Sequence, residues 1–99
     1  MNLEEKSTAE LQMLDSRHYL HPFTDPKALL EKGARVITRA DGIYLWDSDG
    51  EKILDAMAGL WCVNVGYGRE VLSRIAYEQS QELPYYNSFF KTTHPPAIA

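Results

Sequence analysis

The spacing of hydrophobic and polar residues near the N-terminus predicts a short helix. Ser7 and Glu10 have the spacing of a capping box, in which each side chain accepts a hydrogen bond from the free backbone N–H of the other residue. Leu11 and Leu14 then share one helical face, and the signal fades around residues 15–17. We therefore expect a helix that begins after Ser7 and ends near residue 17.

A second short helix is indicated by start and stop signals further along. Asp25 is a good N-cap, Pro26 suits the first helical position, and Gly33 favours a helix end. These signals leave room for about one to two turns.

Three short runs rich in β-branched and aromatic residues follow, at positions 35–38, 43–47 and 52–55. The Asp-Gly pairs at 41–42 and 49–50 separate these runs. Asp-Gly between such runs is a strong hairpin signal, because the favoured two-residue turns need positive φ. The pattern predicts a three-stranded antiparallel meander.

This predicted sheet carries apolar side chains on both faces. Ile43 and Leu45 lie on one face, while Tyr44 and Trp46 lie on the other, because successive side chains of a strand alternate. A small sheet of this kind needs further structure to pack against.

The second half of the chain predicts an irregular segment followed by a long helix. Residues 56–68 contain three glycines, which allow positive φ or close backbone approach. Residues 69–82 follow the helical period and end before Pro84. The apolar stripe expected to face inward consists of Val71, Leu72, Ile75, Ala76 and Leu83.

The C-terminal residues have the pattern of a helix start. Thr93 and His94 offer capping side chains, Pro95 and Pro96 suit the first turn, and good helix formers follow. Because the sequence stops within this helix, we expect residues 1–99 to be the N-terminal segment of a longer protein.

Composition narrows the class of protein. The 99 residues are 44% hydrophobic and 24% charged, which is typical of a soluble globular chain. A net charge of −4 gives no electrostatic basis for nucleic-acid binding, and no segment is apolar and long enough to span a membrane. Cys62 is the single cysteine, so no internal disulfide is expected. The polar N-terminus does not have a secretory pattern, and we expect a cytoplasmic location.

Common catalytic and metal-binding motifs are incomplete. Residues 47–51 resemble the start of a calcium loop, but the glycine and the final glutamate of an EF-hand are out of register, which favours a hairpin turn. His18 and His21 lack a third ligand in register. Cys62 has neither a CxxC partner nor a basic neighbour. We expect no metal site and no cysteine nucleophile.

Two aromatic clusters are the stronger candidates for a site. Leu60 and Trp61 lie in the glycine-rich segment, and residues 84–90 contain two tyrosines and two phenylalanines. Aromatic side chains on loops often line a pocket or an interface. Capping of the core is an equally good interpretation of the pattern alone.

A resemblance to a known family is carried by two segments, DGIYLWDSDGEKILDAMAGLWCVNVGYGRE and ELPYYNSFFKTTHPPAIA. Both are similar to the N-terminal region of class III (ω-amino acid) pyridoxal-phosphate aminotransferases, most of all to the putrescine–pyruvate and β-alanine–pyruvate group. The segment DSRHYLHPFTD also resembles that group. The resemblance thus covers the chain from about Asp15 onward.

The resemblance implies an α/β parent protein of fold type I, with a mostly parallel sheet and active sites at a homodimer interface. This chain would be its α+β N-terminal segment, with short helices, the meander and one long helix. By resemblance, Leu60, Trp61 and Phe23 line the substrate pocket. Phe89 and Phe90 reach the same site from the neighbouring subunit.

The resemblance also implies transfer of an amino group from an ω-amine or diamine to a 2-oxo acid such as pyruvate. The cofactor would be pyridoxal phosphate, held by a lysine. The five lysines of the chain, at positions 6, 27, 32, 52 and 91, have no matching context. We therefore name no catalytic or cofactor-binding residue and expect the chain alone to be inactive.

Two alternatives stay open on the sequence. One is the diaminopelargonate aminotransferase of the biotin pathway, whose N-terminal region is similar to the HPFT block. The other is a non-catalytic binding module of 99 residues, which would need a core of its own.

Overall fold

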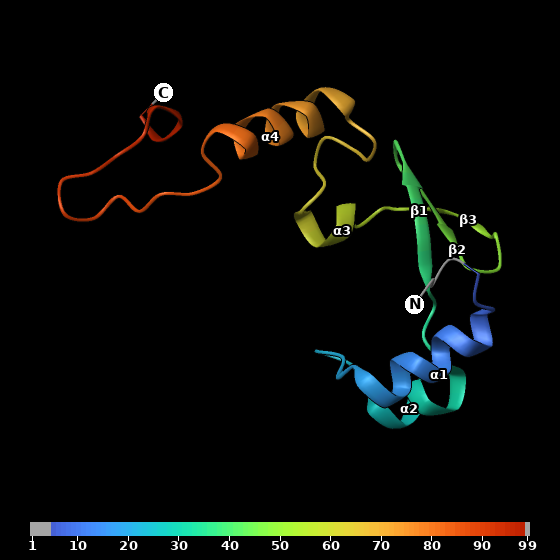
Figure 1. Cartoon of the computed structure of the whole chain (residues 1–99). Coiled ribbons are helices and arrows are strands. Elements are labelled where there is room, and N and C mark those ends of the chain that lie inside the picture. The colour runs from blue at the N-terminus through green and yellow to red at the C-terminus, as the bar shows by residue number, and fades with distance from the viewer. Residues whose placement is uncertain (1–4, 99) are drawn as a thin grey trace. The chain divides into compact units, whose positions relative to one another are not determined.

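The computed structural model describes residues 5–98 (Figure 1). The chain divides into two compact units, Met1–Gly68 and Arg69–Ala99. The first unit holds helices α1 and α2, a three-stranded sheet and the short α3 turn, and the second holds helix α4 and a 3₁₀ turn, η1. Within the described residues, no helix is long and apolar enough to cross a membrane.

Helix α1 (Thr8–His18) begins at the predicted capping box. The backbone N–H of Ser7 donates to Glu10 Oε2 at 2.9 Å, and the N–H of Glu10 donates to Ser7 Oγ at 3.4 Å. Both contacts satisfy N–H groups that the first helical turn leaves free. The predicted start of this helix is therefore confirmed.

Helix α2 (Pro26–Lys32) has the predicted start and end. The Asp25 carboxylate accepts hydrogen bonds from the N–H groups of Lys27 at 2.9 Å and Ala28 at 3.4 Å. Gly33 ends the helix with φ at +74°, a conformation that costs glycine little because it has no Cβ.

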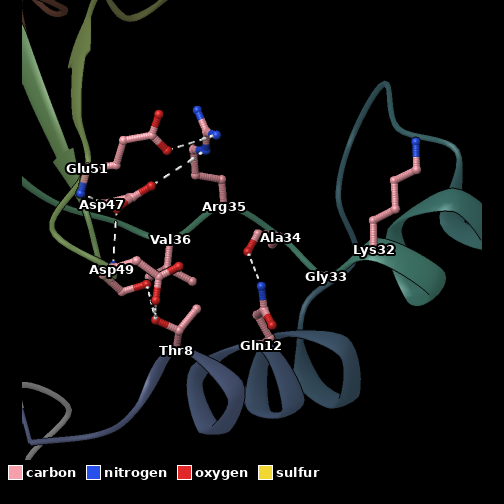
Figure 2. Close-up of a pocket in the computed structure, with 11 residues that line it drawn as sticks. Thr8, Gln12, Lys32, Gly33, Ala34, Arg35, Val36, Asp47, Asp49 and Glu51 are labelled. Atoms are coloured by element: carbon pink, nitrogen blue, oxygen red, sulfur yellow. Dashed lines mark hydrogen bonds and ion pairs between the residues drawn. The ribbon is translucent and has the colours of Figure 1, made fainter.

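Side-chain hydrogen bonds tie α1 to the chain around it (Figure 2). Gln12 Nε2 donates to the Ala34 carbonyl at 2.9 Å, and Thr8 Oγ1 donates to Asp49 Oδ1 at 2.6 Å. A Cβ on Gly33 would lie 2.6 Å from the end of the flexible Gln12 side chain, which would have to move to accommodate it. These contacts set α1 against the start of the sheet.

The sheet is the predicted antiparallel meander. Its strands are β1 (Ile37–Asp41), β2 (Tyr44–Asp47) and β3 (Lys52–Leu54), in the order β1-β2-β3. The β2–β3 connection contains the predicted Asp-Gly turn, in which the N–H of Gly50 donates to the Asp47 carbonyl at 3.0 Å.

The prediction for the first strand was wrong in its bounds. The sequence favoured residues 35–38, whereas β1 extends to Asp41 and pairs Arg39 with Trp46 and Asp41 with Tyr44. Pairing with β2 draws these polar residues into the strand, and the register shifts between positions 37 and 39. Hydrophobic patterning could not show either effect.

Cations cover the aromatic face of the sheet. The Arg39 guanidinium lies 3.7 Å from the ring centre of Trp46, and Lys52 Nζ lies 3.8 Å from that of Tyr44. A cation over an aromatic face is attracted by the ring quadrupole while it stays in contact with water. The two charged side chains thus cover the aromatic rings of this face and remain in contact with water themselves.

Helix α4 (Glu70–Glu82) in the second unit confirms the predicted long helix. Its apolar stripe, however, does not face inward: the side chains of Val71, Leu72 and Ile75 are exposed in the described chain. Within residues 69–98, the second unit consists of α4, an extended segment and η1 (Pro95–Ala97), and these leave the stripe uncovered. The predicted C-terminal helix is a single 3₁₀ turn within residues 5–98.

No hydrophobic side chain among residues 5–98 is buried. The one buried residue in this range is Asp47, at 6% exposure. Twenty-two large hydrophobic side chains are exposed, far more than the scattered exposed apolar residues of ordinary monomers. Hydrogen bonds and caps therefore define the elements, while their apolar faces stay uncovered.

Candidate functional site

The α3 turn (Ala58–Trp61) carries two of the predicted pocket residues on an unusual backbone. Four consecutive residues have positive φ: Ala58 at 50°, Gly59 at 55°, Leu60 at 60° and Trp61 at 69°. Left-handed backbone costs a residue with a Cβ roughly 1–2 kcal/mol. Surrounding contacts must therefore hold this turn in place.

Asp55 supplies such contacts. Its carboxylate accepts hydrogen bonds from the N–H of Met57 at 3.0 Å, the N–H of Gly59 at 3.0 Å and the hydroxyl of Tyr67 at 2.7 Å. The Tyr67 hydrogen bond and these backbone donors lower the pKa of Asp55, against a smaller opposing effect of burial. The same hydrogen bond raises the pKa of the Tyr67 hydroxyl, because loss of its proton would remove the donor; burial and the negative charge of Asp55 act in the same direction.

The side chains of Leu60 and Trp61 project from this turn and are largely exposed. Leu60 is 56% exposed and Trp61 is 81% exposed. The backbone is thus held firmly by Asp55, while the apolar side chains have no cover in the first unit. This is the arrangement expected of residues that meet something outside the segment.

Phe23 lies in the turn between α1 and α2, also with positive φ, at 49°. Its side chain is fully exposed. The turn is fixed on either side of it, since Thr24 Oγ1 donates to the Pro22 carbonyl at 2.8 Å and His21 Nε2 lies 2.8 Å from an Asp15 carboxylate oxygen. The structure describes no contact that brings Phe23 to the α3 turn.

Phe89 and Phe90 lie in the second unit, on the segment between α4 and η1. Their rings form an edge-to-face pair with centroids 6.4 Å apart. The Phe89 N–H donates to Asn87 Oδ1 at 3.0 Å, and Thr92 Oγ1 donates to the Phe89 carbonyl at 2.6 Å. Phe90 has φ at 55° and is 93% exposed.

The predicted pocket residues therefore share a property that the sequence did not indicate. Six non-glycine residues have positive φ in the described chain, and four of them are Phe23, Leu60, Trp61 and Phe90. Strained backbone of this kind clusters at functional sites. Sequence reasoning missed Asp55 and Tyr67, although both lie within the segments that carry the family resemblance.

A cavity of about 280 Å³ lies between α1 and the sheet (Figure 2). Three of its charged groups pair with one another: Arg35 lies 3.6 Å from Asp47 Oδ2 and 3.3 Å from Glu51 Oε2. The other Asp47 oxygen accepts hydrogen bonds from the N–H groups of Asp49 at 3.1 Å and Glu51 at 2.8 Å. This cavity is part of the framework and contains none of the predicted site residues.

Metal-binding side chains do not cluster within residues 5–98. No group of three or more His, Cys, Asp or Glu side chains in residues 5–98 could hold a metal ion. None of the five lysines is buried within the described residues. Lys52, for example, lies over the Tyr44 and Trp46 rings on the open face of the sheet.

Comparison with known proteins identifies the family. The family model described as aminotransferase class-III matches residues 29–98. The chain therefore belongs to the class III aminotransferases.

Individual relatives agree with this assignment. The putrescine–pyruvate aminotransferase of Pseudomonas aeruginosa is 65% identical over 91 residues, which are 92% of this chain and 20% of that protein. A thermostable (S)-enantioselective omega-transaminase from Thermomicrobium roseum has a TM-score of 0.88 at 40% identity and matches 94% of this chain and 21% of its own. The omega transaminase of Pseudomonas jessenii, solved in complex with PMP, has a TM-score of 0.84 at 36% identity and matches 89% of this chain and 19% of its own. This chain thus spans about a fifth of the length of the relatives that it matches.

One solved structure bears on individual positions. It is a thermostable omega transaminase in which a tryptophan, a phenylalanine and an arginine were substituted for the asymmetric synthesis of enantiopure bulky amines. It is 35% identical to this chain, with a TM-score of 0.84, and covers 89% of this chain and 20% of its own.

Proposed function

We propose that this chain is the N-terminal segment of an aminotransferase that transfers an amino group from an ω-amine or diamine to a 2-oxo acid such as pyruvate. The observation that carries the proposal is the 65% identity, over 92% of this chain, to the putrescine–pyruvate aminotransferase of P. aeruginosa. Putrescine and β-alanine are the donors we favour. Because this chain spans about a fifth of that relative, the activity would belong to a longer protein that contains it.

The proposed cofactor of that longer protein is pyridoxal phosphate. The PMP complex of the P. jessenii omega transaminase supports this choice. When bound, the cofactor supplies an electron sink for the reaction at the amine-bearing carbon. By the family resemblance, the lysine that holds the cofactor would lie further along the longer protein, outside this chain.

The part proposed for this chain is to shape the substrate pocket. Leu60, Trp61 and Phe23 would line it, and Phe89 and Phe90 would reach it from the neighbouring subunit of a homodimer. Such apolar walls bind the methylene chain of the donor, at about 0.8 kcal/mol for each buried CH₂. They also exclude water and hold the amino group in one direction.

The engineered omega transaminase supports two of these assignments. The tryptophan and the phenylalanine substituted in that enzyme have the same separation along the chain as Trp61 and Phe89 have here. Their substitution served to make bulky amines, which is consistent with residues that limit the size of the substrate. The spacing matches Phe89 rather than its neighbour Phe90.

A transamination assay of the full-length protein encoded by this reading frame tests the proposal. With putrescine and pyruvate, we expect alanine to form as putrescine is consumed. A matched control is the P. aeruginosa enzyme in which this chain replaces the 91 aligned residues, and this hybrid is expected to keep its activity. The proposed function would be wrong if the hybrid enzyme were active while the full-length protein of this reading frame formed no alanine from pyruvate with any ω-amine.

A further inference from the structure

The α3 turn needs an external restraint, because only one of its four left-handed residues is glycine. The contacts within the turn do not explain its hand, since hydrogen bonds such as Trp61 N–H to the Met57 carbonyl at 3.1 Å also form in right-handed turns. The restraint must come from groups that would not meet the turn in another conformation. Asp55 and Tyr67 are such groups.

Both residues are fixed to the sheet. Asp55 follows β3 directly, and its N–H donates to the Ile43 carbonyl at 2.9 Å. Tyr67 forms an isolated antiparallel bridge with Gly42, with hydrogen bonds of 3.2 Å and 2.8 Å. Two separate backbone anchors therefore place the carboxylate and the phenol on the same hairpin.

The two side chains then meet the turn at one residue. The Asp55 carboxylate accepts the Gly59 N–H at 3.0 Å and the Tyr67 hydroxyl at 2.7 Å. The Tyr67 hydroxyl lies so close that a Cβ on Gly59 would be 3.3 Å from it and 3.1 Å from a methyl of Val63. Gly59 directly precedes Leu60 and Trp61, so its backbone direction decides where their side chains point.

We propose that Asp55 and Tyr67 are a positioning pair that connects the α3 turn to the sheet and so holds Leu60 and Trp61 in one orientation. The pair thereby sets the amine preference of the pocket. The part that concerns amine preference rests on the function proposed above. Neither residue is assigned contact with the substrate or the cofactor.

The test uses two variants of the full-length protein, Tyr67→Phe and Asp55→Asn. Tyr67→Phe removes one hydroxyl and keeps the ring. Asp55→Asn keeps one oxygen acceptor and removes the charge. The matched controls are Tyr77→Phe, on the exposed surface of α4, and Asp41→Asn, whose carboxylate accepts no hydrogen bond from the described residues.

The first measurement is amide hydrogen exchange over residues 57–63. Loss of one hydrogen bond is expected to speed exchange in this segment about two- to tenfold in both variants, with no change in the controls. The second is the ratio of kcat/KM for putrescine to that for a bulkier amine. We expect this ratio to fall about two- to tenfold, through KM more than kcat.

The outcomes separate this inference from the proposed function. Unchanged exchange over residues 57–63 in both variants would overturn the positioning pair, whatever the activity. Faster exchange with an unchanged kcat/KM ratio would overturn its role in amine preference and leave a purely structural hydrogen bond. If the unmodified protein shows no transamination, the proposed function fails, and the exchange measurement still decides whether the pair holds the turn.

Discussion

Left-handed backbone and exposed apolar side chains coincide at single residues of this chain. Leu60 and Trp61 have φ values of 60° and 69°, in a region that residues with a Cβ rarely adopt. The cost is offset by hydrogen bonds that Asp55 accepts. The residue that determines the geometry is therefore distinct from the residues proposed to meet the substrate.

Replacement of Gly59 by alanine tests how tightly the α3 turn is enclosed. The positive φ is unfavourable for alanine, and the added Cβ would also lie 3.1 Å from Val63 and 3.3 Å from the Tyr67 hydroxyl. Gly50→Ala is the matched control, because Gly50 also has positive φ but open space around its Cβ position. We expect about 1 kcal/mol lost from local stability in Gly50→Ala and a larger loss in Gly59→Ala. Equal losses by amide exchange would show that the turn is open at this point.

The Asp55–Tyr67 pair predicts a pH window for the order of the α3 turn. The folded pKa of Asp55 lies below its ordinary value of 3.8, so its contribution is complete above that value and is lost as the pH falls through the lowered pKa. The folded pKa of Tyr67 lies above its ordinary value of 10.0, so its contribution is complete below that value and is lost as the pH rises through the raised pKa. Protection factors of the Met57 and Gly59 amides should follow this window.

The variant Tyr67→Phe provides the control for that window. In this variant, the loss of amide protection at low pH should begin at a higher pH, because the largest cause of the lowered Asp55 pKa is removed. The loss of amide protection at high pH should disappear, because the variant has no phenol to lose its proton. If protection were lost at the same low pH in both proteins, the assignment of that pKa shift to Tyr67 would be contradicted.

At single residues, the sequence indicated candidate pocket side chains, but it did not indicate the residues that support their backbone. Leu60 and Trp61 stand out as large apolar residues in a glycine-rich segment. Asp55 and Tyr67 are separated by 12 positions and meet because backbone hydrogen bonds anchor both to the connection between β1 and β2. A contact of that kind depends on tertiary structure and leaves no local pattern.

Among the elements, most of the local signals were confirmed, although the predicted C-terminal helix is a single 3₁₀ turn. The capping residues Ser7 and Asp25 act within three positions of the groups that they cap, so the sequence alone predicted the starts of α1 and α2. The extent of β1 depends on its pairing with β2, which draws in Arg39 and Asp41. The orientation of the α4 stripe depends on partners that the second unit does not contain.

The β2–β3 hairpin allows a comparison of two carboxylates that share one arginine. Asp47 is buried and also accepts two backbone N–H groups, whereas Glu51 is exposed and contacts only Arg35 through its side chain. We expect Asp47→Ala to cost about 1.5–3 kcal/mol of local stability, because it leaves those two donors without a partner. The matched variant Glu51→Ala should cost about 0–1 kcal/mol. Amide exchange of the hairpin measures both, and equal losses would contradict a framework role for Asp47.

For the whole molecule, the uncovered apolar surface is the decisive property. Ordering the backbone costs about 1–2 kcal/mol per residue, and burial of apolar surface is the main compensation. No hydrophobic side chain in residues 5–98 is buried, so this compensation is small within the chain itself. The apolar faces of α4 and of the α3 turn are consistent with a segment whose packing partners belong to a longer aminotransferase.

The isolated 99-residue chain is therefore expected not to fold cooperatively. Its urea titration, followed by far-ultraviolet circular dichroism, should show a gradual loss of signal without the slope of a native domain of this length. In the full-length protein, Ile75→Asp should lower the melting temperature strongly, because we expect the exposed α4 stripe to be covered there. Glu78→Gln on the same helix is the matched control and should have little effect. A cooperative transition of the isolated chain, together with a harmless Ile75→Asp, would favour an independent binding module over a segment of an enzyme.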